Sequence, residues 1–320
     1  MTNYGYTLMC EQRGPRDLVD DAVRAEAAGF GFAVCSDHYY PWLAEQGHAP
    51  FAWSVLGAAA HVTDRIGLVS FVTCPTMRYH PAVVAQMAAT VGVMSGGRFT
   101  LGLGAGENLN EHVVGAYPQA TQRHAMLAEA LDIIKPLLAG ETVHHSGEFY
   151  DVPEARLWDL PEERVPIGVA VSGPSSCRLA ARHDAALIAV EPKAELIEAY
   201  EKSGGNGRPR YGQVALCWGP DADACAQTAY EQFRWFNLGW AVNAELPGPR
   251  AFDAAAAAIT PEYVASKIPC GPDVDRHVAA IREFTDAGFT DVAVLQIGGD
   301  SQPEFLDFAH KELLPALNGG

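Results

Sequence analysis

Eight short apolar stretches that alternate with helical patterns constrain the fold of this chain more than any other feature. The apolar stretches are residues 6–9, 31–35, 66–73, 99–103, 167–171, 186–190, 213–218 and 292–297. Helical spacing of apolar residues is found at 16–28, 52–62, 82–94, 122–138, 175–182, 193–202, 223–236, 274–287 and 303–317. Strands that alternate with helices in this way form a parallel sheet. Eight such units predict a closed (β/α)₈ (TIM) barrel, and a doubly wound open sheet is the alternative.

Two segments do not follow the alternation. Residues 142–164 are rich in turn formers, so we expect a small irregular excursion there. Residues 237–270, which include the alanine run 254–258, are expected to form an inserted cap of helices after the seventh strand. No low-complexity linker divides the 320 residues, so a single barrel domain, 1–320, is expected.

Charge and cysteine usage narrow the functional classes. The formal net charge of −17 makes nucleic acid and anionic membranes poor partners, which leaves a small-molecule substrate. No run of 18 apolar residues suggests a membrane span, and the first residues do not resemble a signal peptide. The seven cysteines lack CxxC spacing, so buried free thiols in a reducing cytoplasm are expected.

The clearest sign of chemistry is the run that follows the second apolar stretch. Asp37, His38 and Trp42 come just past a predicted strand, and parallel α/β folds gather their functional groups at that end of the strands. Glu107 follows the fourth strand and therefore belongs to the same mouth. A histidine and a carboxyl in a partly apolar mouth both titrate near neutrality, so His38 and Glu107 are predicted to form an acid–base pair. A structural histidine is the alternative, and Trp42 is either core packing or a wall against water.

The segments that follow the fourth and fifth predicted strands can each be interpreted as a ligand-binding site or as a purely structural feature. The glycine run at 102–106 lacks Gly-x-Gly-x-x-Gly spacing, so it indicates either close approach of neighbouring strands or backbone lying against a planar ligand. Ser172, Gly173, Ser175 and Ser176 begin a helix, where they either bind a phosphate or cap the helix alone. We expect no metal site, because His144 and His145 have no partner at i+4, and no Gly-x-Ser-x-Gly elbow suggests a serine hydrolase.

Five segments together carry a family resemblance over nearly the whole chain. They are residues 36–38 with 41–42, residues 47–51, residues 74–82, residues 102–107 with 110–111, and residues 172–174. With these motifs the chain resembles the luciferase-like flavin and deazaflavin oxidoreductases. Within that family it resembles the branch related to coenzyme F420-dependent glucose-6-phosphate dehydrogenase. The family fold is a (β/α)₈ barrel, which agrees with the strand count.

The resemblance implies coenzyme F420 across the barrel mouth, with FMN as the alternative, and hydride transfer between an alcohol carbon and C5 of the deazaflavin. The implied cofactor contacts are Asp37, Phe71, Val72, Cys74, Ala105, Gly106, Asn110, Ser172, Gly173, Ser175 and Ser176. A non-proline cis peptide is implied between Phe71 and Val72. The implied catalytic residues are His38, Glu107 and Trp42. Which of His38 and Glu107 is base and which is acid stays open.

The substrate is left open by the same resemblance. Val190, Lys193 and Lys267 fall at substrate-binding positions, but the position of a further phosphate-binding lysine falls among residues 253–255, where there is no basic residue. A sugar phosphate or another alcohol therefore remains possible, in either direction of hydride transfer. An FMN-dependent monooxygenase and a non-catalytic cofactor-binding protein are the alternative functions. Family analogy suggests a homodimer.

Overall fold

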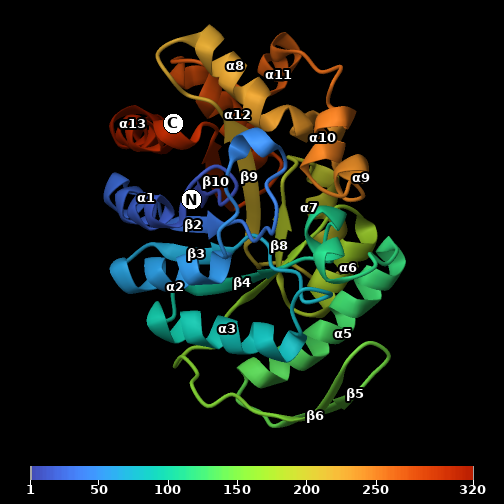
Figure 1. Cartoon of the computed structure of the whole chain (residues 1–320). Coiled ribbons are helices and arrows are strands. Elements are labelled where there is room, and N and C mark those ends of the chain that lie inside the picture. The colour runs from blue at the N-terminus through green and yellow to red at the C-terminus, as the bar shows by residue number, and fades with distance from the viewer. Residues whose placement is uncertain (1, 320) are drawn as a thin grey trace.

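Eight parallel strands close into a barrel in the computed structural model, which describes residues 2–319 (Figure 1). The strands are β1 (Asn3–Leu8), β2 (Phe32–Cys35), β3 (Gly67–Ser70), β4 (Phe99–Leu103), β7 (Ile167–Ala170), β8 (Ala186–Ala189), β9 (Arg210–Leu216) and β10 (Asp291–Gln296). Their order around the barrel is β1-β10-β9-β8-β7-β4-β3-β2, which follows the chain. The predicted barrel is confirmed, and the open sheet is excluded because β1 pairs with both β2 and β10.

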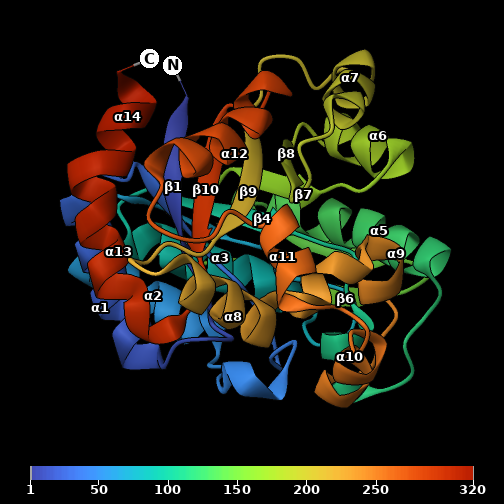
Figure 2. The same ribbon diagram turned by 90° about the horizontal axis from the view of Figure 1, so that it is seen from above.

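Helices surround the barrel, as Figure 2 shows from above. The longer ones are α1 (Pro15–Ala28), α2 (Ala52–Val62), α3 (Pro81–Met94), α5 (Ala120–Leu138), α6 (Pro174–Arg182), α7 (Ala194–Lys202), α8 (Ala222–Phe233) and α12 (Val274–Asp286). The chain ends in α13 (Gln302–Phe308), the π-helical segment η5 (Ala309–Leu313) and α14 (Leu314–Asn318). The sequence predicted one α-helix there. Pro315 has no N–H to donate, so a locally wider helix before it is expected.

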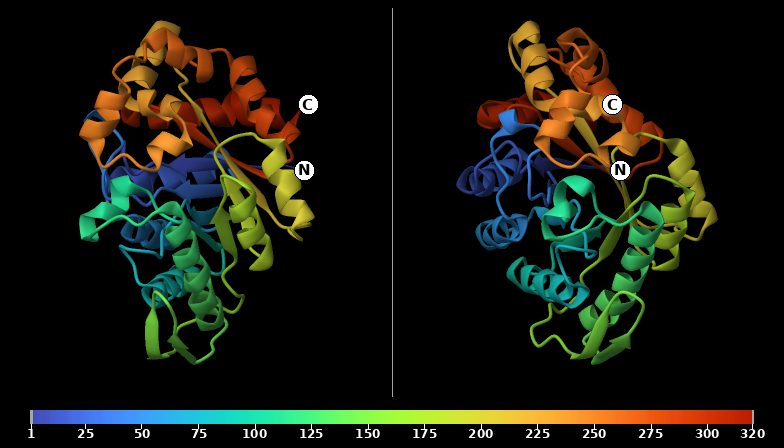
Figure 3. Two further views of the ribbon diagram at one scale, coloured as in Figure 1. Left: turned by 90° about the vertical axis from the view of Figure 1, so that its right-hand side faces the viewer. Right: turned by 45° about the vertical axis from the view of Figure 1, so that its right-hand side comes forward.

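Residues 142–164 are more regular than predicted, and this expectation was wrong. Strands β5 (Val143–Ser146) and β6 (Asp151–Ala155) form an antiparallel hairpin, seen at the bottom of both views in Figure 3. The carboxylate of Glu129, on α5, accepts hydrogen bonds from the backbone N–H groups of residues 148, 149 and 150. A side chain outside the segment therefore fixes its turn, which a local pattern does not reveal.

Between α8 and α12 the chain forms four short helices. They are η3 (Arg234–Leu238), α9 (Trp240–Asn243), α10 (Pro249–Ala255) and α11 (Pro261–Lys267). In Figure 2 they lie over one part of the barrel mouth. We call residues 234–267 the cap segment. Its buried apolar side chains, such as Trp235, Phe252 and Val264, form one cluster with Trp42 and Leu295 from the barrel mouth.

The glycine run 102–106, which begins within β4 and continues past its end, lacks side chains for structural reasons. A Cβ on Gly102 would lie 2.0 Å from the carbonyl oxygen of Ser70, and one on Gly104 would lie 2.6 Å from Cγ2 of Val72. Gly106 has a φ of +93°, which other residues rarely adopt. Close strand approach thus explains Gly102 and Gly104, and a backbone turn explains Gly106.

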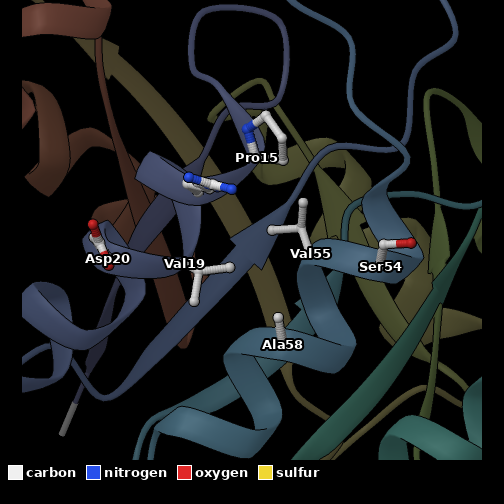
Figure 4. Close-up of a pocket in the computed structure, with 7 residues that line it drawn as sticks. Pro15, Val19, Asp20, Ser54, Val55 and Ala58 are labelled. Atoms are coloured by element: carbon white, nitrogen blue, oxygen red, sulfur yellow. The ribbon is translucent and has the colours of Figure 1, made fainter.

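A surface hollow of about 420 Å³ lies between α1 and α2, lined by side chains that include Pro15, Val19, Ser54 and Val55 (Figure 4). None of the predicted site residues lines it, so we place the chemistry elsewhere. No helix within residues 2–319 is long and apolar enough to cross a membrane.

Three shorter helical turns follow the strand ends and shape the mouth. They are η1 (Ala44–Gln46) after β2, and α4 (Asn108–Glu111) with η2 (His112–Val114) after β4. A further turn, η4 (Gly299–Ser301), follows β10. These turns and the cap segment rise from the carboxyl ends of the strands, where the predicted site residues also lie.

Candidate active site

His38 lies between two carboxylates at the barrel mouth. Its Nδ1 is 2.9 Å from Oε1 of Glu11, and its Nε2 is 3.7 Å from Oε2 of Glu107. Glu11 follows β1, His38 follows β2 and Glu107 follows β4, so three strand ends meet here. The predicted pair of His38 and Glu107 is therefore brought together, and Glu11 completes it from the other side of the imidazole.

Glu11 is held firmly in this arrangement. Its side chain is fully buried, and its Oε2 accepts a hydrogen bond of 2.7 Å from the hydroxyl of Ser36. That hydroxyl accepts a hydrogen bond of 2.9 Å from the backbone N–H of Cys10. The hydroxyl of Ser36 thus fixes the carboxylate, and the carboxylate places a negative charge at the Nδ1 side of the imidazole.

The charges of the three groups are coupled. Burial acts to lower the pKa of His38, but the carboxylates of Glu11 and Glu107 outweigh it and raise that pKa to about 9. Burial acts to raise the pKa of Glu11, and the His38 imidazolium outweighs it and lowers that pKa. Burial raises the pKa of Glu107, with Glu11 and Glu111 acting in the same direction. At neutral pH the imidazole is therefore protonated, and Glu107 is the more easily protonated carboxyl of the two that flank it.

Asn110 connects Glu107 to the loop that carries His38. Its Nδ2 donates to Oε2 of Glu107 at 3.3 Å, and its Oδ1 accepts from the backbone N–H of Tyr39 at 2.8 Å. Asn110 is buried, on α4. The predicted cofactor contact thus also orders the two loops that bear the acid–base pair.

Asp37 points into a second buried cluster. Its carboxylate accepts hydrogen bonds from the hydroxyl of Thr73 at 2.7 Å, the hydroxyl of Tyr79 at 3.1 Å and the guanidinium of Arg78 at 3.3 Å. Arg78 also forms an ion pair of 3.3 Å with the fully buried Glu111. The cluster ties the ends of β2, β3 and β4 together, so Asp37 has a structural role, and its cofactor contact stays a prediction.

The floor between β3 and β4 is made of small and apolar groups. The peptide bond between Phe71 and Val72 is cis, which confirms that prediction. Val72 and Ala105 are partly exposed, and Gly106 is buried. Cys74 is buried beside them, since a Cβ on Gly104 would lie 3.4 Å from its sulfur. The hydroxyl of Thr76, next to Gly106, is buried and has no hydrogen-bond partner among residues 2–319. A flat ring with polar groups at its edge suits this floor.

Ser176 caps the amino end of α6, the helix that follows β7. Its hydroxyl accepts hydrogen bonds from the backbone N–H groups of Ser172 at 3.1 Å and Gly173 at 3.3 Å, and donates to the carbonyl of Gly173. This is the capping interpretation of the segment. Ser172 and Ser175 are exposed, and nothing lies within 4 Å of a Cβ placed on Gly173, so this side of the mouth is open.

Trp42 forms an aromatic wall with the cap segment. Its ring lies parallel to that of Trp235 at a centroid distance of 4.0 Å, and perpendicular to Phe252 at 5.0 Å. The imidazole of His38 is 4.9 Å from Trp42 on a tilted plane. The indole therefore stands between the acid–base pair and the cap, so it is both a wall and part of a packed cluster.

Arg234 clasps two segments beside this wall. Its Nη2 is 2.8 Å from a carboxylate oxygen of Glu45, on η1, and 2.8 Å from one of Asp253, on α10. The guanidinium is almost wholly buried, although both carboxylates are half-exposed or more. This contact joins residues about 190 positions apart in the sequence.

The predicted substrate residues lie at the rim. Lys193 is exposed, and its ammonium is 2.9 Å from the carboxylate of Glu191. Lys267 is exposed on α11, with its ammonium 5.9 Å from the ring centroid of Tyr263. Val190 is an exposed apolar side chain at the end of β8.

The sequence prediction missed Glu11 and Arg234 as parts of the mouth. Glu11 had a usable signal, because a charged residue directly past an apolar strand is the same pattern that identified Asp37 and His38. Arg234 had none, because its two partners are distant in the sequence.

Comparisons with known proteins agree with this geometry. The family model described as luciferase-like monooxygenase matches residues 3–291. A relative from Microbacterium testaceum, named F420-dependent glucose-6-phosphate dehydrogenase, is 37% identical, with 98% of this chain and 97% of that protein aligned. A relative of the same name from Intrasporangium calvum is 35% identical over the full length of both chains.

Among solved structures, an F420-dependent secondary alcohol dehydrogenase in complex with an F420–acetone adduct is similar with a TM-score of 0.89. It is 25% identical in sequence, and 99% of each chain is covered. The coenzyme F420-dependent tetrahydromethanopterin reductase of Methanopyrus kandleri shares the fold with a TM-score of 0.78 at 20% identity, again with 99% of each chain covered.

Proposed function

The chain belongs to the luciferase-like monooxygenase family, and from this premise we propose that it is an F420-dependent oxidoreductase that transfers a hydride between an alcohol carbon and the cofactor. The observation that carries the proposal is the buried imidazole of His38 between Glu11 and Glu107, beside a floor suited to a flat ring. The similarity to F420-dependent dehydrogenases supports F420 over FMN.

F420 fits the residues of the mouth. Val72, Cys74, Ala105 and Gly106 would lie against its ring, and the unpartnered hydroxyl of Thr76 offers a hydrogen bond at the edge. Asp37, Phe71, Asn110, Ser172, Gly173, Ser175 and Ser176 complete the proposed contacts. When bound, F420 supplies a two-electron acceptor whose C5 takes the hydride as the alcohol becomes a carbonyl.

The geometry supports one assignment of the proton-transfer roles. Glu11 occupies the Nδ1 side of His38, so Nε2 is the atom that would accept the hydroxyl proton of the alcohol as its C–H bond breaks. This step needs the neutral imidazole, so it uses the fraction of the enzyme in which His38 has lost its proton, and that fraction grows as the pH rises toward 9. Glu107, whose pKa is raised by burial, would be the acid that supplies a proton to the reduced ring. Trp42 shields the reacting carbon from water on the cap side. His38, Glu107 and Trp42 are thus the proposed catalytic residues, and Glu11 is a positioning residue.

Cofactor binding and turnover, measured side by side, test the proposal. We expect the protein to bind oxidised F420 more tightly than FMN, and the visible absorbance of F420 to fall without oxygen when alcohols or sugar phosphates are added. Preferential FMN binding with oxygen-dependent turnover would contradict it. Tight F420 binding with no oxidation of any alcohol would favour a non-catalytic cofactor-binding protein.

We also infer a homodimer that uses the outer faces of α2 and α3. Neither helix contains Asp, Glu, Lys or Arg, although the chain carries a net charge of −17. Val62, Val83, Val93 and Met94 on these helices are each 44% exposed or more. Two equally charged copies meet most easily where carboxylates are absent. Val83→Asp with Met94→Asp should turn a dimer into a monomer in light scattering, and an unchanged mass would contradict this interface.

The thiols support a proposal for the cellular location. All seven cysteines are buried and free. Because thiols stay reduced in the cytoplasm, we propose a cytoplasmic enzyme.

A further inference from the structure

The wall beside His38, on the cap side of the mouth, is apolar. Trp42, Trp235 and Phe252 present stacked and perpendicular aromatic rings, and all three are nearly or fully buried. Phe233 and Phe236 pack behind Trp235, at centroid distances of 4.9 and 5.9 Å. A substrate carbon held at Nε2 of His38 therefore has aromatic surface, not hydrogen-bonding groups, on its cap side.

Most of the cations around the mouth are already neutralised. Four cationic side chains of the strand-end loops and the cap are ion-paired with six carboxylates. The pairs are Arg78 with Asp37 and Glu111, Arg123 with Glu245, Lys193 with Glu191, and Arg234 with Glu45 and Asp253. Two exposed cations of the cap form no ion pair among the described residues: Lys267, which lies near the ring of Tyr263, and Arg250 on α10. A dianionic phosphate binds through several charge-assisted hydrogen bonds, and a mouth with more carboxylates than cations disfavours it.

Apolar side chains also border the opening. Tyr40 is 36% exposed and stacks on His112, while Trp240 is 40% exposed on α9. The two lie on adjoining segments, because the backbone N–H of Asn108, one helical turn before His112, donates to the carbonyl of Ala244 at the end of α9. A long apolar substituent would thus meet apolar surface both inside the mouth and at its edge.

Arg234 holds this wall in place. It directly precedes Trp235, and its guanidinium joins η1 just after Trp42 to α10, which carries Phe252. The segments that carry the three aromatic rings are therefore held together by one buried side chain, that of Arg234. The same clasp uses the guanidinium completely, so it offers no free positive charge to a substrate.

We propose that this mouth selects an uncharged secondary alcohol, or its ketone, with apolar substituents, and that Arg234 is the residue that determines this selection by clasping η1 to α10. The inference rests on the proposed function and specifies its substrate class. It places a phosphorylated sugar among the poor substrates of this protein.

A chain-length series tests the substrate class with the F420-loaded enzyme. The substrates are 2-propanol, 2-butanol, 2-pentanol and 2-hexanol, compared with glucose and glucose 6-phosphate. Each added methylene buried against the wall should raise kcat/KM about threefold to fourfold. Glucose 6-phosphate should be used at least tenfold less efficiently than 2-hexanol. Glucose 6-phosphate as the best substrate would overturn the inference and leave the proposed function intact, whereas F420 binding without oxidation of any alcohol would refute both.

Arg234→Met tests the specificity residue. The KM for 2-hexanol should rise at least tenfold with kcat within threefold, and the chain-length trend should flatten, while 2-propanol changes little. Arg234→Lys should recover part of the trend, because an ammonium keeps the charge but not the two-armed geometry. Arg208→Met removes another arginine–carboxylate pair, at the amino end of β9, and is the matched control that should leave the trend unchanged.

A purely structural role for Arg234 would lower the rate with all alcohols alike and keep the trend, and that result would overturn the assignment. If Arg234→Met does not fold, Glu45→Gln and Asp253→Asn each remove one arm of the clasp and should flatten the trend partly. Binding of 2-hexanone, followed by quenching of tryptophan fluorescence, gives a readout independent of turnover. It should saturate in the wild type and weaken at least tenfold in Arg234→Met, and equal binding in both would contradict the proposal.

Discussion

The two sides of the barrel mouth differ in how they are built and in what holds them. On one side, Glu11, His38 and Glu107 come from the ends of three barrel strands and interact through buried charge. On the other side, Trp235 and Phe252 come from the cap segment and interact through aromatic packing, with a single guanidinium as clasp. The difference supports the proposal that the strand-end side performs the proton chemistry and the cap side selects the substrate. Variants on the first side should therefore change kcat and pH dependence, and variants on the second should change KM.

The largest expected effect comes from removing the imidazole. His38→Ala should lower kcat for alcohol oxidation by about 10³-fold, within the range for loss of a general base. F420 binding, measured by fluorescence titration, should change less than threefold. His144→Ala, at an exposed position of β5, is the control and should behave as wild type. A kcat for His38→Ala within tenfold of the wild-type value would contradict the role of His38 as the general base.

Trp235→Ala should destabilise the cap segment while leaving the barrel strands almost as stable as in the wild type. Large-to-small changes at buried aromatic positions cost about 3–5 kcal/mol, and Trp235 is 7% exposed. The loss should be concentrated in the cap, so hydrogen exchange should quicken in residues 234–267 and stay slow in the barrel strands. Trp158→Ala, at a position 85% exposed, is the matched control. Uniform acceleration across all strands would show that the cap and the barrel are not separable.

The coupling at His38 makes stability depend on pH. The pKa of His38 is about 9 in the fold, against 6.5 for an ordinary histidine, so protonation favours the folded state. This contribution, roughly 3 kcal/mol, is complete below pH 6.5 and is lost as the pH rises through 9. Urea denaturation of the wild type should therefore weaken between pH 7 and 10 more than that of His38→Ala, whereas Arg234→Met should follow the wild type. If the free energy of unfolding changed with pH in the same way for the wild type and His38→Ala, the coupling of His38 to its neighbouring carboxylates would be contradicted.

A smaller effect is expected from Glu11→Gln, which keeps the shape and removes the charge. Without that carboxylate the pKa of His38 should fall, so the rising limb of the kcat/KM profile should move to lower pH. The plateau rate should fall about tenfold, because a less basic imidazole accepts the proton less well. Glu45→Gln, on the cap side, should leave the profile in place. An unmoved limb in Glu11→Gln would show that Glu11 does not control His38.

The same contrast explains what could be predicted from sequence. All eight barrel strands were found, because strand periodicity is local. The sequence also predicted that His38 and Glu107 meet, because the barrel brings every strand's carboxyl end to one mouth, and their acid–base role stays a prediction. Glu11 was missed although the same rule covers it. The clasp of Arg234 on Glu45 and Asp253 was out of reach, because no local pattern pairs residues so far apart in the chain. The hairpin of β5 and β6 was missed for the same reason, since Glu129 fixes its turn from another element.

Isotope transfer tests the central claim most directly. A secondary alcohol that carries deuterium on its carbinol carbon would be oxidised by the F420-loaded enzyme without oxygen, and the reduced cofactor would be analysed by mass spectrometry. The account predicts one deuterium in the reduced cofactor for each ketone formed, together with a primary isotope effect on kcat at pH 9. Deuterium that appears in the solvent instead, or turnover that requires oxygen, would contradict hydride transfer at this site.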